Sequence, residues 1–128
     1  MAAWKLDRRR SERFKVAWAG RLTCYFPGLV EDIEVKVMEI SAGGARLEVE
    51  TLEIGINHLV VGSESTRFTL KLSLPEYALS VPIRMIWYSA AQDKHAFNLG
   101  VLFLDTSAEV KETFDKILKD VALATAGS

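Results

Sequence analysis

Apolar and polar residues alternate along several short stretches of this chain, which is the pattern of strands with one buried and one solvated face. The period of two appears over residues 31–39, 45–50 and 67–74. In the first stretch Ile33, Val35 and Val37 alternate with residues such as Glu34 and Lys36. All three stretches are therefore predicted to be strands, and Gly43-Gly44 to form the turn between the first two.

Three further strands are predicted from apolar runs bounded by turn signals, at residues 15–22, 79–89 and 96–104. Because the last run is continuously apolar, we expect it to be buried on both faces. Trp87, near the end of the preceding run, is expected to lie in the core. Residues 51–65 are less regular, and we expect a loop there with a short strand at 59–61.

One helix is predicted near the C-terminus. Thr106 and Glu109 have the spacing of a capping box, and the apolar residues that follow fall on one helical face. These are Val110, Phe114, Ile117, Leu118 and Val121. The small residues from 122 onward are expected to fray. The predicted fold is mostly β: a small closed six-stranded antiparallel β-barrel with one C-terminal α-helix across an opening or face.

Composition indicates one domain with its own core. The chain has 128 residues, of which 49% are hydrophobic and 26% charged. It contains one cysteine, Cys24, which we interpret as a small core residue in a reducing compartment. Neither a secretory signal nor an apolar stretch of membrane-spanning length is present, so no membrane insertion and a cytoplasmic location are expected.

The residues needed for common enzyme sites are not grouped in the sequence. His58 and His95 occur in unrelated loops without partners at metal-ligand spacing. Ser41 and Ser107 have no histidine and acid nearby in sequence, although pairing in space stays open. Most carboxylates alternate with apolar residues and so belong to solvated faces. We therefore expect a binding protein with no enzymatic activity and no metal site.

Positive charge is concentrated at the N-terminus. Residues 1–21 contain seven Lys and Arg against two acids, and the rest of the chain has a net charge of −6. Residues 1–13 are interpreted as a flexible basic arm that contains Arg8, Arg9, Arg10 and Arg13. Guanidinium groups bind phosphates and guanine edges in a bidentate manner and stack on bases. Taken alone, such an arm also fits a solubilising or nonspecific role.

A second polar segment connects two predicted strands, from Glu39 through Ser41 and Gly44 to Leu47. Glycine permits tight turns, and serine or an acid caps free backbone amides in them. The same residues also suit a ligand floor, because glycine allows a base to approach the backbone while a hydroxyl and a carboxylate accept donors from guanine. By itself the segment predicts only a turn.

Together the two segments resemble the PilZ domain, the bacterial receptor for the second messenger cyclic di-GMP. That family combines RRxxxR with a later [D/N]xSxxG. Arg8, Arg9 and Arg13 match the first motif, and Glu39, Ser41 and Gly44 match the spacing of the second. Residues 83–87, ending in Trp, and 100–103, reading GVLF, resemble the late strands of the family.

The resemblance implies that Arg8, Arg9, Arg13, Glu39, Ser41 and Gly44 bind cyclic di-GMP. It also implies that the arm folds over this ligand and that the protein then signals to a protein effector, without a cofactor. The expected organisation is an arm at 1–13, a barrel with its helix at 14–122 and a frayed tail at 123–128. Glu39 replaces the usual Asp or Asn, and residues 51–67 form a longer connection than expected.

Two alternatives follow from the same residues. One is a PilZ-like adaptor for motility or pilus machinery that has lost nucleotide binding, which the Glu39 replacement favours and the two retained arginines oppose. The other is an OB-like barrel for single-stranded nucleic acid. The negative charge after residue 22 opposes the second alternative, so no DNA or RNA partner is expected. The sequence leaves the oligomeric state open.

Overall fold

The computed structural model of the chain describes residues 13–92, 95–104 and 107–126. The bounds of its elements are β1 (Phe14–Phe26), β2 (Leu29–Ile40), β3 (Gly44–Val49), β4 (Glu53–Ile54), β5 (Asn57–His58), β6 (Arg67–Ser73), β7 (Ala78–Ala90), β8 (Phe97–Phe103) and α2 (Ala108–Ala126). The six longer strands occur at the six places that the sequence predicts, although β1 continues four residues further to Phe26.

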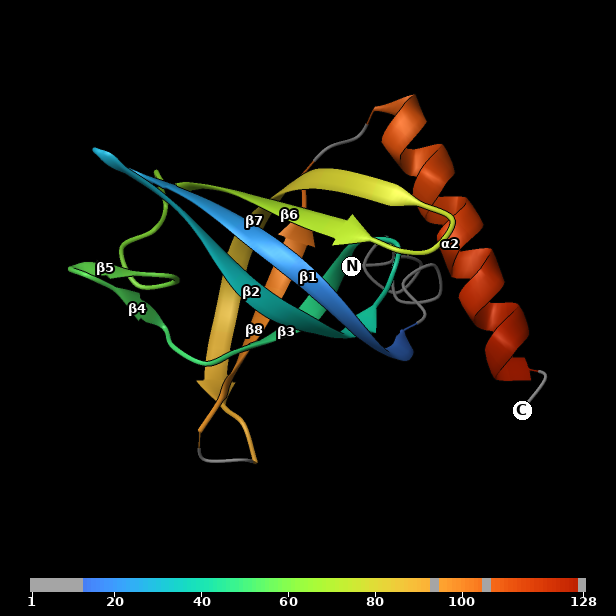
Figure 1. Cartoon of the computed structure of the whole chain (residues 1–128), viewed down its shortest axis with the longest axis horizontal. Helices are drawn as coiled ribbons and strands as arrows, with labels where there is room; N and C mark the ends of the chain where they lie inside the picture. Colours follow the sequence, from blue (N-terminus) through green and yellow to red (C-terminus); the bar gives the residue numbers. More distant parts are fainter. Residues whose placement is uncertain (1–12, 93–94, 105–106, 127–128) are drawn as a thin grey trace, which may run out of the picture.

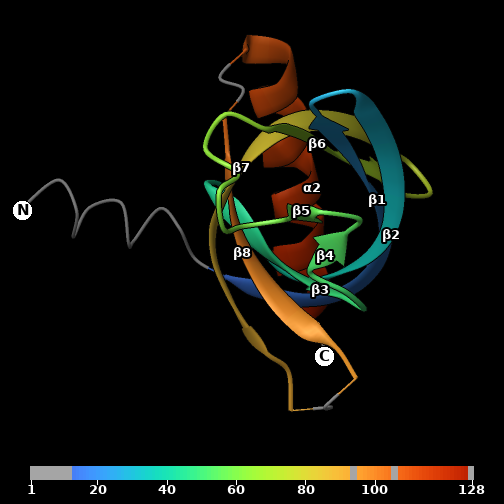
Figure 2. The same ribbon diagram turned by 90° about the vertical axis from the view of Figure 1, so that its left-hand side faces the viewer.

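The six long strands form a closed antiparallel barrel in the order β1-β2-β3-β8-β7-β6, as Figure 1 shows. This confirms the predicted fold class. Closure gives every long strand two hydrogen-bonded neighbours, so none of the six presents a free edge. The small β4–β5 sheet lies at one end of the barrel and α2 at the other (Figures 1 and 2).

The core fills the barrel with the inward residues of all six strands. The largest fully buried side chains include Phe68, Leu22, Ile40, Leu47, Leu70, Leu72 and Leu99. Cys24 is also fully buried. Burial, with further contributions from Asp32 and Glu31, raises the pKa of its thiol to about 12. The thiol is therefore protonated near neutral pH, in agreement with a core role.

The connection from β3 to β6 differs from the prediction. Residues 59–61 are not a strand; the pairing occurs earlier, where β4 and β5 form a hairpin. Gly55 makes this hairpin turn possible because it has φ 61°. Leu59 is fully buried, and the Nδ1 atom of His58 accepts hydrogen bonds from the backbone N–H groups of Val60 and Val61, each 2.9 Å long. The Leu59 side chain thus anchors the loop in the barrel core, and the His58 bonds fix the local turn that follows it.

The last strand is buried on one face only, contrary to the prediction. Leu99 and Val101 face the core, but Leu102 is 43% exposed and Leu104, just beyond β8, is 49% exposed. The outer face of this part of β8 is not covered by α2, which packs near the end of the strand through Phe103. A continuous apolar run therefore does not distinguish a doubly buried strand from one that lines a surface cavity.

Helix α2 begins after Ser107, whose hydroxyl accepts the N–H of Val110 at 3.3 Å. Thr106, the predicted cap, lies outside the described residues. The helix extends to Ala126 and so includes residues 122–126, where the sequence predicts fraying; alanine, which occurs three times there, has the highest helix propensity. Among the described residues, no helix has the length and apolar character to span a membrane.

The helix is held on the barrel by a few specific contacts. Phe114 stacks against Phe103 with ring centroids 4.5 Å apart, and Ile117 is buried beside it. The hydroxyl of Tyr77, in the β6–β7 turn, donates to Asp120 at 2.7 Å, and this bond raises the pKa of Tyr77. The apolar face of α2 and the Tyr77–Asp120 hydrogen bond therefore hold the helix against the end of the barrel.

We expect Phe114→Ala to lower the free energy of unfolding by about 3–5 kcal/mol, because it removes a buried aromatic ring and leaves a cavity. The control is Leu123→Ala on the same helix, where the side chain is 64% exposed and the expected change is within about 0.5 kcal/mol. Urea unfolding followed by circular dichroism measures both. Equal losses in the two variants would contradict this account of helix docking.

Candidate functional site

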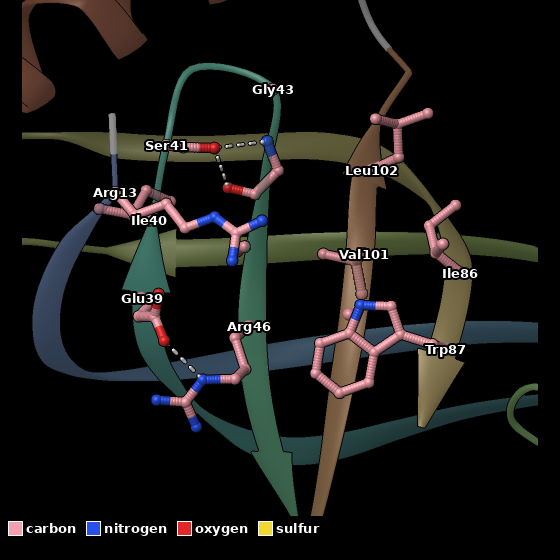
Figure 3. Close-up of a pocket in the computed structure, with 13 residues that line it drawn as sticks. Arg13, Glu39, Ile40, Ser41, Gly43, Arg46, Ile86, Trp87, Val101 and Leu102 are labelled. Carbon is pink, nitrogen blue, oxygen red and sulfur yellow. Dashed lines mark hydrogen bonds and ion pairs between the residues drawn. The ribbon is translucent and has the colours of Figure 1, made fainter. Parts of the chain in front are cut away.

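A cavity of about 240 Å³ opens on the barrel surface between the start of the described chain, the β2–β3 turn and strands β7 and β8. Figure 3 shows its walls. The lining residues are Arg13, Glu39, Ile40, Ser41, Gly43, Gly44, Ala45, Arg46, Ile86, Trp87, Gly100, Val101 and Leu102. Polar residues from β2, β3 and Arg13 form one wall, and apolar residues from β7 and β8 form the other.

The polar wall contains an ion pair beside a guanidinium. The Nε–H of Arg46 donates to Oε2 of Glu39 at 2.8 Å, and its Nη1 group donates to Oδ1 of Asn98 at 3.0 Å. The Arg13 guanidinium lies on the same side of the cavity as Glu39 and Ser41 (Figure 3). This wall offers donors for an anion and a carboxylate acceptor within one small space.

Ser41 and Gly44 shape the turn that forms the floor. The Ser41 hydroxyl accepts the N–H of Gly44 and donates to its carbonyl, both at 3.2 Å, and the Ser41 N–H also donates to that carbonyl at 2.9 Å. A Cβ atom at residue 44 would overlap the carbonyl oxygen of Val101 on β8. The φ of Gly44 is not positive, so its backbone conformation does not itself require glycine. Glycine is required there because β3 and β8 approach each other closely.

The apolar wall contains Trp87, which the sequence analysis places in the core. This prediction is wrong: Trp87 is 43% exposed and lines the cavity. Val81, Ile83 and Met85 point inward in alternation, but the β7–β8 register shifts between Met85 and Trp87. One extra residue reverses the direction of the side chains that follow. The bulge at Ile86 thus turns the indole outward.

A second register shift acts in the same way on the acid. The β2–β3 pairing shifts between Val37 and Glu39, so Glu39 leaves the inward face that Val37 occupies. The two bulges place Glu39, Arg46, Gly100 and Trp87 in one row of cross-strand partners on the outer surface. At residue 100 an added Cβ would overlap the indole, so glycine leaves the space that Trp87 occupies.

The structure brings together four of the six predicted site residues: Arg13, Glu39, Ser41 and Gly44 all line the cavity. Arg8 and Arg9 lie outside the described residues. Sequence reasoning missed Arg46 as a site residue, although its outward position beside the second motif was a usable signal. It also missed Ile86 and Leu102. Alternation gives no signal for either residue, because Ile86 is exposed by a bulge and Leu102 by an uncovered outer face of β8.

In the described part of the chain, no group of three or more His, Cys, Asp and Glu is arranged to hold a metal ion. The side chains that do converge are two guanidiniums, a carboxylate and an indole. Guanidiniums bind phosphates or guanine edges, and aromatic rings stack on bases. The arrangement is therefore suited to an anionic ligand that contains flat rings.

The family follows from a comparison with family models. The model of the PilZ domain matches residues 7–120, which is most of the chain. This chain belongs to the PilZ domain family. A search of curated proteins found no match.

Solved structures agree with this assignment at the level of the fold. The PilZ domain of Escherichia coli YcgR, solved with cyclic di-GMP, has a TM-score of 0.67 and 15% identity, covering 92% of this chain and 94% of that one. The MrkH complex with cyclic di-GMP from K. pneumonia also has a TM-score of 0.67, with 17% identity over 93% of this chain and 53% of that one. The Bacillus subtilis inhibitor of motility MotI/DgrA has 0.60, with 14% identity and coverage of 88% and 52%. This chain thus spans about half the length of the MrkH and MotI/DgrA chains.

We expect Gly44→Ala to lower the free energy of unfolding by about 1–3 kcal/mol, because its methyl group would push β3 away from the Val101 carbonyl. The control is Gly55→Asn in the β4–β5 turn, where no atom lies within 4 Å and asparagine tolerates the positive φ, so the expected loss is below about 1 kcal/mol. Denaturant unfolding compares the two. A neutral Gly44→Ala variant would show that the motif glycine has no steric role.

Proposed function

We propose that this PilZ domain is a receptor for cyclic di-GMP. The observation that carries the proposal is the convergence of Arg13, Glu39, Ser41 and Gly44 on one cavity whose opposite wall is an exposed indole. Arg13, the segment from Glu39 to Gly44, and Trp87 are separated from one another by 26 or more positions in sequence, and they meet at this cavity. A domain whose role is only structural would not require this combination of charged groups and exposed aromatic surface.

Each wall matches one part of the proposed ligand. Cyclic di-GMP has two phosphates and two guanine bases. Arg13 would bind a phosphate or the O6/N7 edge of a base. Arg46 engages Oε2 of Glu39, which leaves Oε1 to accept an N–H from the Watson–Crick edge of a guanine. Trp87 would stack on a base, and Gly44 would allow close approach to the turn.

The arm would complete the site. A cavity of about 240 Å³ is smaller than the roughly 300–1,000 Å³ of usual ligand pockets. Arg9 precedes Arg13 by four residues, and the chain spans at most about 3.6 Å per residue, so its Cα lies within about 14 Å of that of Arg13. Arg8 and Arg9 would therefore bind the phosphates from the open side, with residues 1–13 folding over the ligand.

Ordering of the arm would also transmit the signal. Residues 1–13 would change from a flexible segment to a covering of the cavity, which creates a new surface for a protein effector. Coupled folding of this kind costs about 2–5 kcal/mol of the gross interaction energy. The measured affinity is the interaction free energy that remains after this cost. Loss of the contacts made by the arm's arginines would therefore eliminate most measurable binding.

The test is calorimetric titration with cyclic di-GMP. We expect micromolar or tighter binding for the wild type, no detectable binding for Arg9→Ala/Arg13→Ala, and none with GTP. The control is Arg21→Ala/Lys71→Ala, which removes two positive charges from an exposed cross-strand pair outside the cavity and leaves affinity unchanged within about twofold. Absence of heat with a wild type that is folded by circular dichroism would overturn the receptor role and favour the adaptor alternative.

Tryptophan fluorescence gives an independent readout. The chain has three tryptophans, and in a Trp4→Phe/Trp18→Phe background only Trp87 reports. We expect cyclic di-GMP to quench this emission. In calorimetry, Trp87→Ala is expected to weaken binding by about 5- to 150-fold, as base–aromatic stacking of about 1–3 kcal/mol requires. Ile86→Ala on the same wall is the control, with a smaller loss. Unchanged emission at saturation would exclude stacking on Trp87.

A further inference from the structure

Arg46 lies outside both sequence motifs, yet it connects the acid of the second motif to a neighbouring strand. Its guanidinium joins Glu39 on β2 to Asn98 on β8, with bonds of 2.8 and 3.0 Å. Glu39 and Arg46 are cross-strand partners, and Asn98 is paired with Glu48, two residues beyond Arg46. The three side chains thus form one continuous network over three adjacent strands beside the cavity.

The geometry points to Arg46 as a positioning residue for ligand binding, which acts by holding the Glu39 carboxylate; this inference rests on the proposed function. Glutamate has one more methylene than the Asp or Asn of the family pattern, and therefore one more rotatable bond to fix. The side chains of Arg46 and Glu39 are only 28% and 24% exposed. Their contact is thus partly shielded from water and fixes a carboxylate that would otherwise sample several rotamers.

The guanidinium suits this role better than an ammonium group does. Its donors lie in one rigid plane, so anchoring Nη1 on Asn98 also fixes the direction of the Nε–H toward Glu39. Lysine has one nitrogen and cannot hold two acceptors in that fixed relation. Because Nε engages only Oε2, the other oxygen of Glu39 is held in place as an acceptor.

Charge gives a second reason for the pairing. An isolated carboxylate in this cavity would repel a ligand with two phosphates. Arg46 balances that charge at the carboxylate, so Glu39 can accept from a base while the wall as a whole, with Arg13, keeps a positive balance. The same acid without its partner would oppose binding, which makes the two residues energetically coupled.

A double-mutant cycle in calorimetry tests this coupling with wild type, Arg46→Ala, Glu39→Ala and the double variant. We expect Arg46→Ala to weaken cyclic di-GMP binding about tenfold or more in the wild-type background, the usual effect of losing a charged hydrogen bond. In the Glu39→Ala background the same change is expected to cost less than about threefold. Arg46→Lys should give an intermediate loss and Asn98→Ala a smaller one.

A readout without ligand tests the contact itself. The Nε–H resonance of Arg46 in a nitrogen–proton spectrum should be protected from solvent exchange in the wild type and lose that protection in Glu39→Ala. Unfolding by urea checks that each variant is folded. Exchange that is unaltered by Glu39→Ala would overturn the inference, because the carboxylate then does not hold the guanidinium.

The outcomes separate this inference from the proposed function. Absence of wild-type binding overturns the receptor role and the positioning role with it. Binding by the wild type with unchanged affinity in Arg46→Ala overturns the positioning role alone. Equal losses in the two backgrounds also overturn it, because Arg46 then contacts the ligand directly and not through Glu39.

Discussion

The site depends on two β-bulges, at Met38 and Ile86, that reverse the direction of side chains in strands β2 and β7. Upstream of each bulge the odd-numbered residues face the core, as Val37 and Met85 do. Downstream of it, Glu39 and Trp87 point outward. A residue inserted in one strand costs local pairing but leaves the rest of the sheet in register. The barrel therefore keeps a continuous core and still presents an acid and an indole on one outer row.

Two glycines leave the space for a cavity beside that row of residues. At Gly100 the missing side chain leaves room for the Trp87 indole, and at Gly44 it allows β3 to approach the Val101 carbonyl. A larger residue at either place would fill or widen the space between the polar and apolar walls. The shape of the cavity thus depends on the lack of a side chain at Gly44 and Gly100 as well as on the side chains that line it. Bulges of this kind are common beside functional sites because they redirect single residues.

Much of the fold follows from local pattern. Alternation predicts three of the strands, apolar runs between turn signals predict the other three, and helical spacing predicts the helix. The barrel follows because closure of the six strands removes free edges. The motifs also predict which polar residues meet, since the structure brings Glu39, Ser41, Gly44 and Arg13 together. Trp87 is different, because its direction depends on a register shift that one strand's sequence does not reveal. Arg46 was missed for a related reason: its partners Glu39 and Asn98 are neighbours only after β3 pairs on both sides.

In the proposed receptor, division of the site between the strands and the N-terminal arm would have an energetic consequence. Glu39, Arg46 and Asn98 lie on paired strands and are joined by hydrogen bonds, so in the proposed receptor this wall would contribute to binding with little ordering cost. Arg8 and Arg9 would belong to the arm, and ordering of the arm would reduce affinity by the free energy needed to fix its backbone. Such a receptor would lose some affinity but gain a large change in one segment. In this proposal an effector protein would recognise that change without any movement of the barrel.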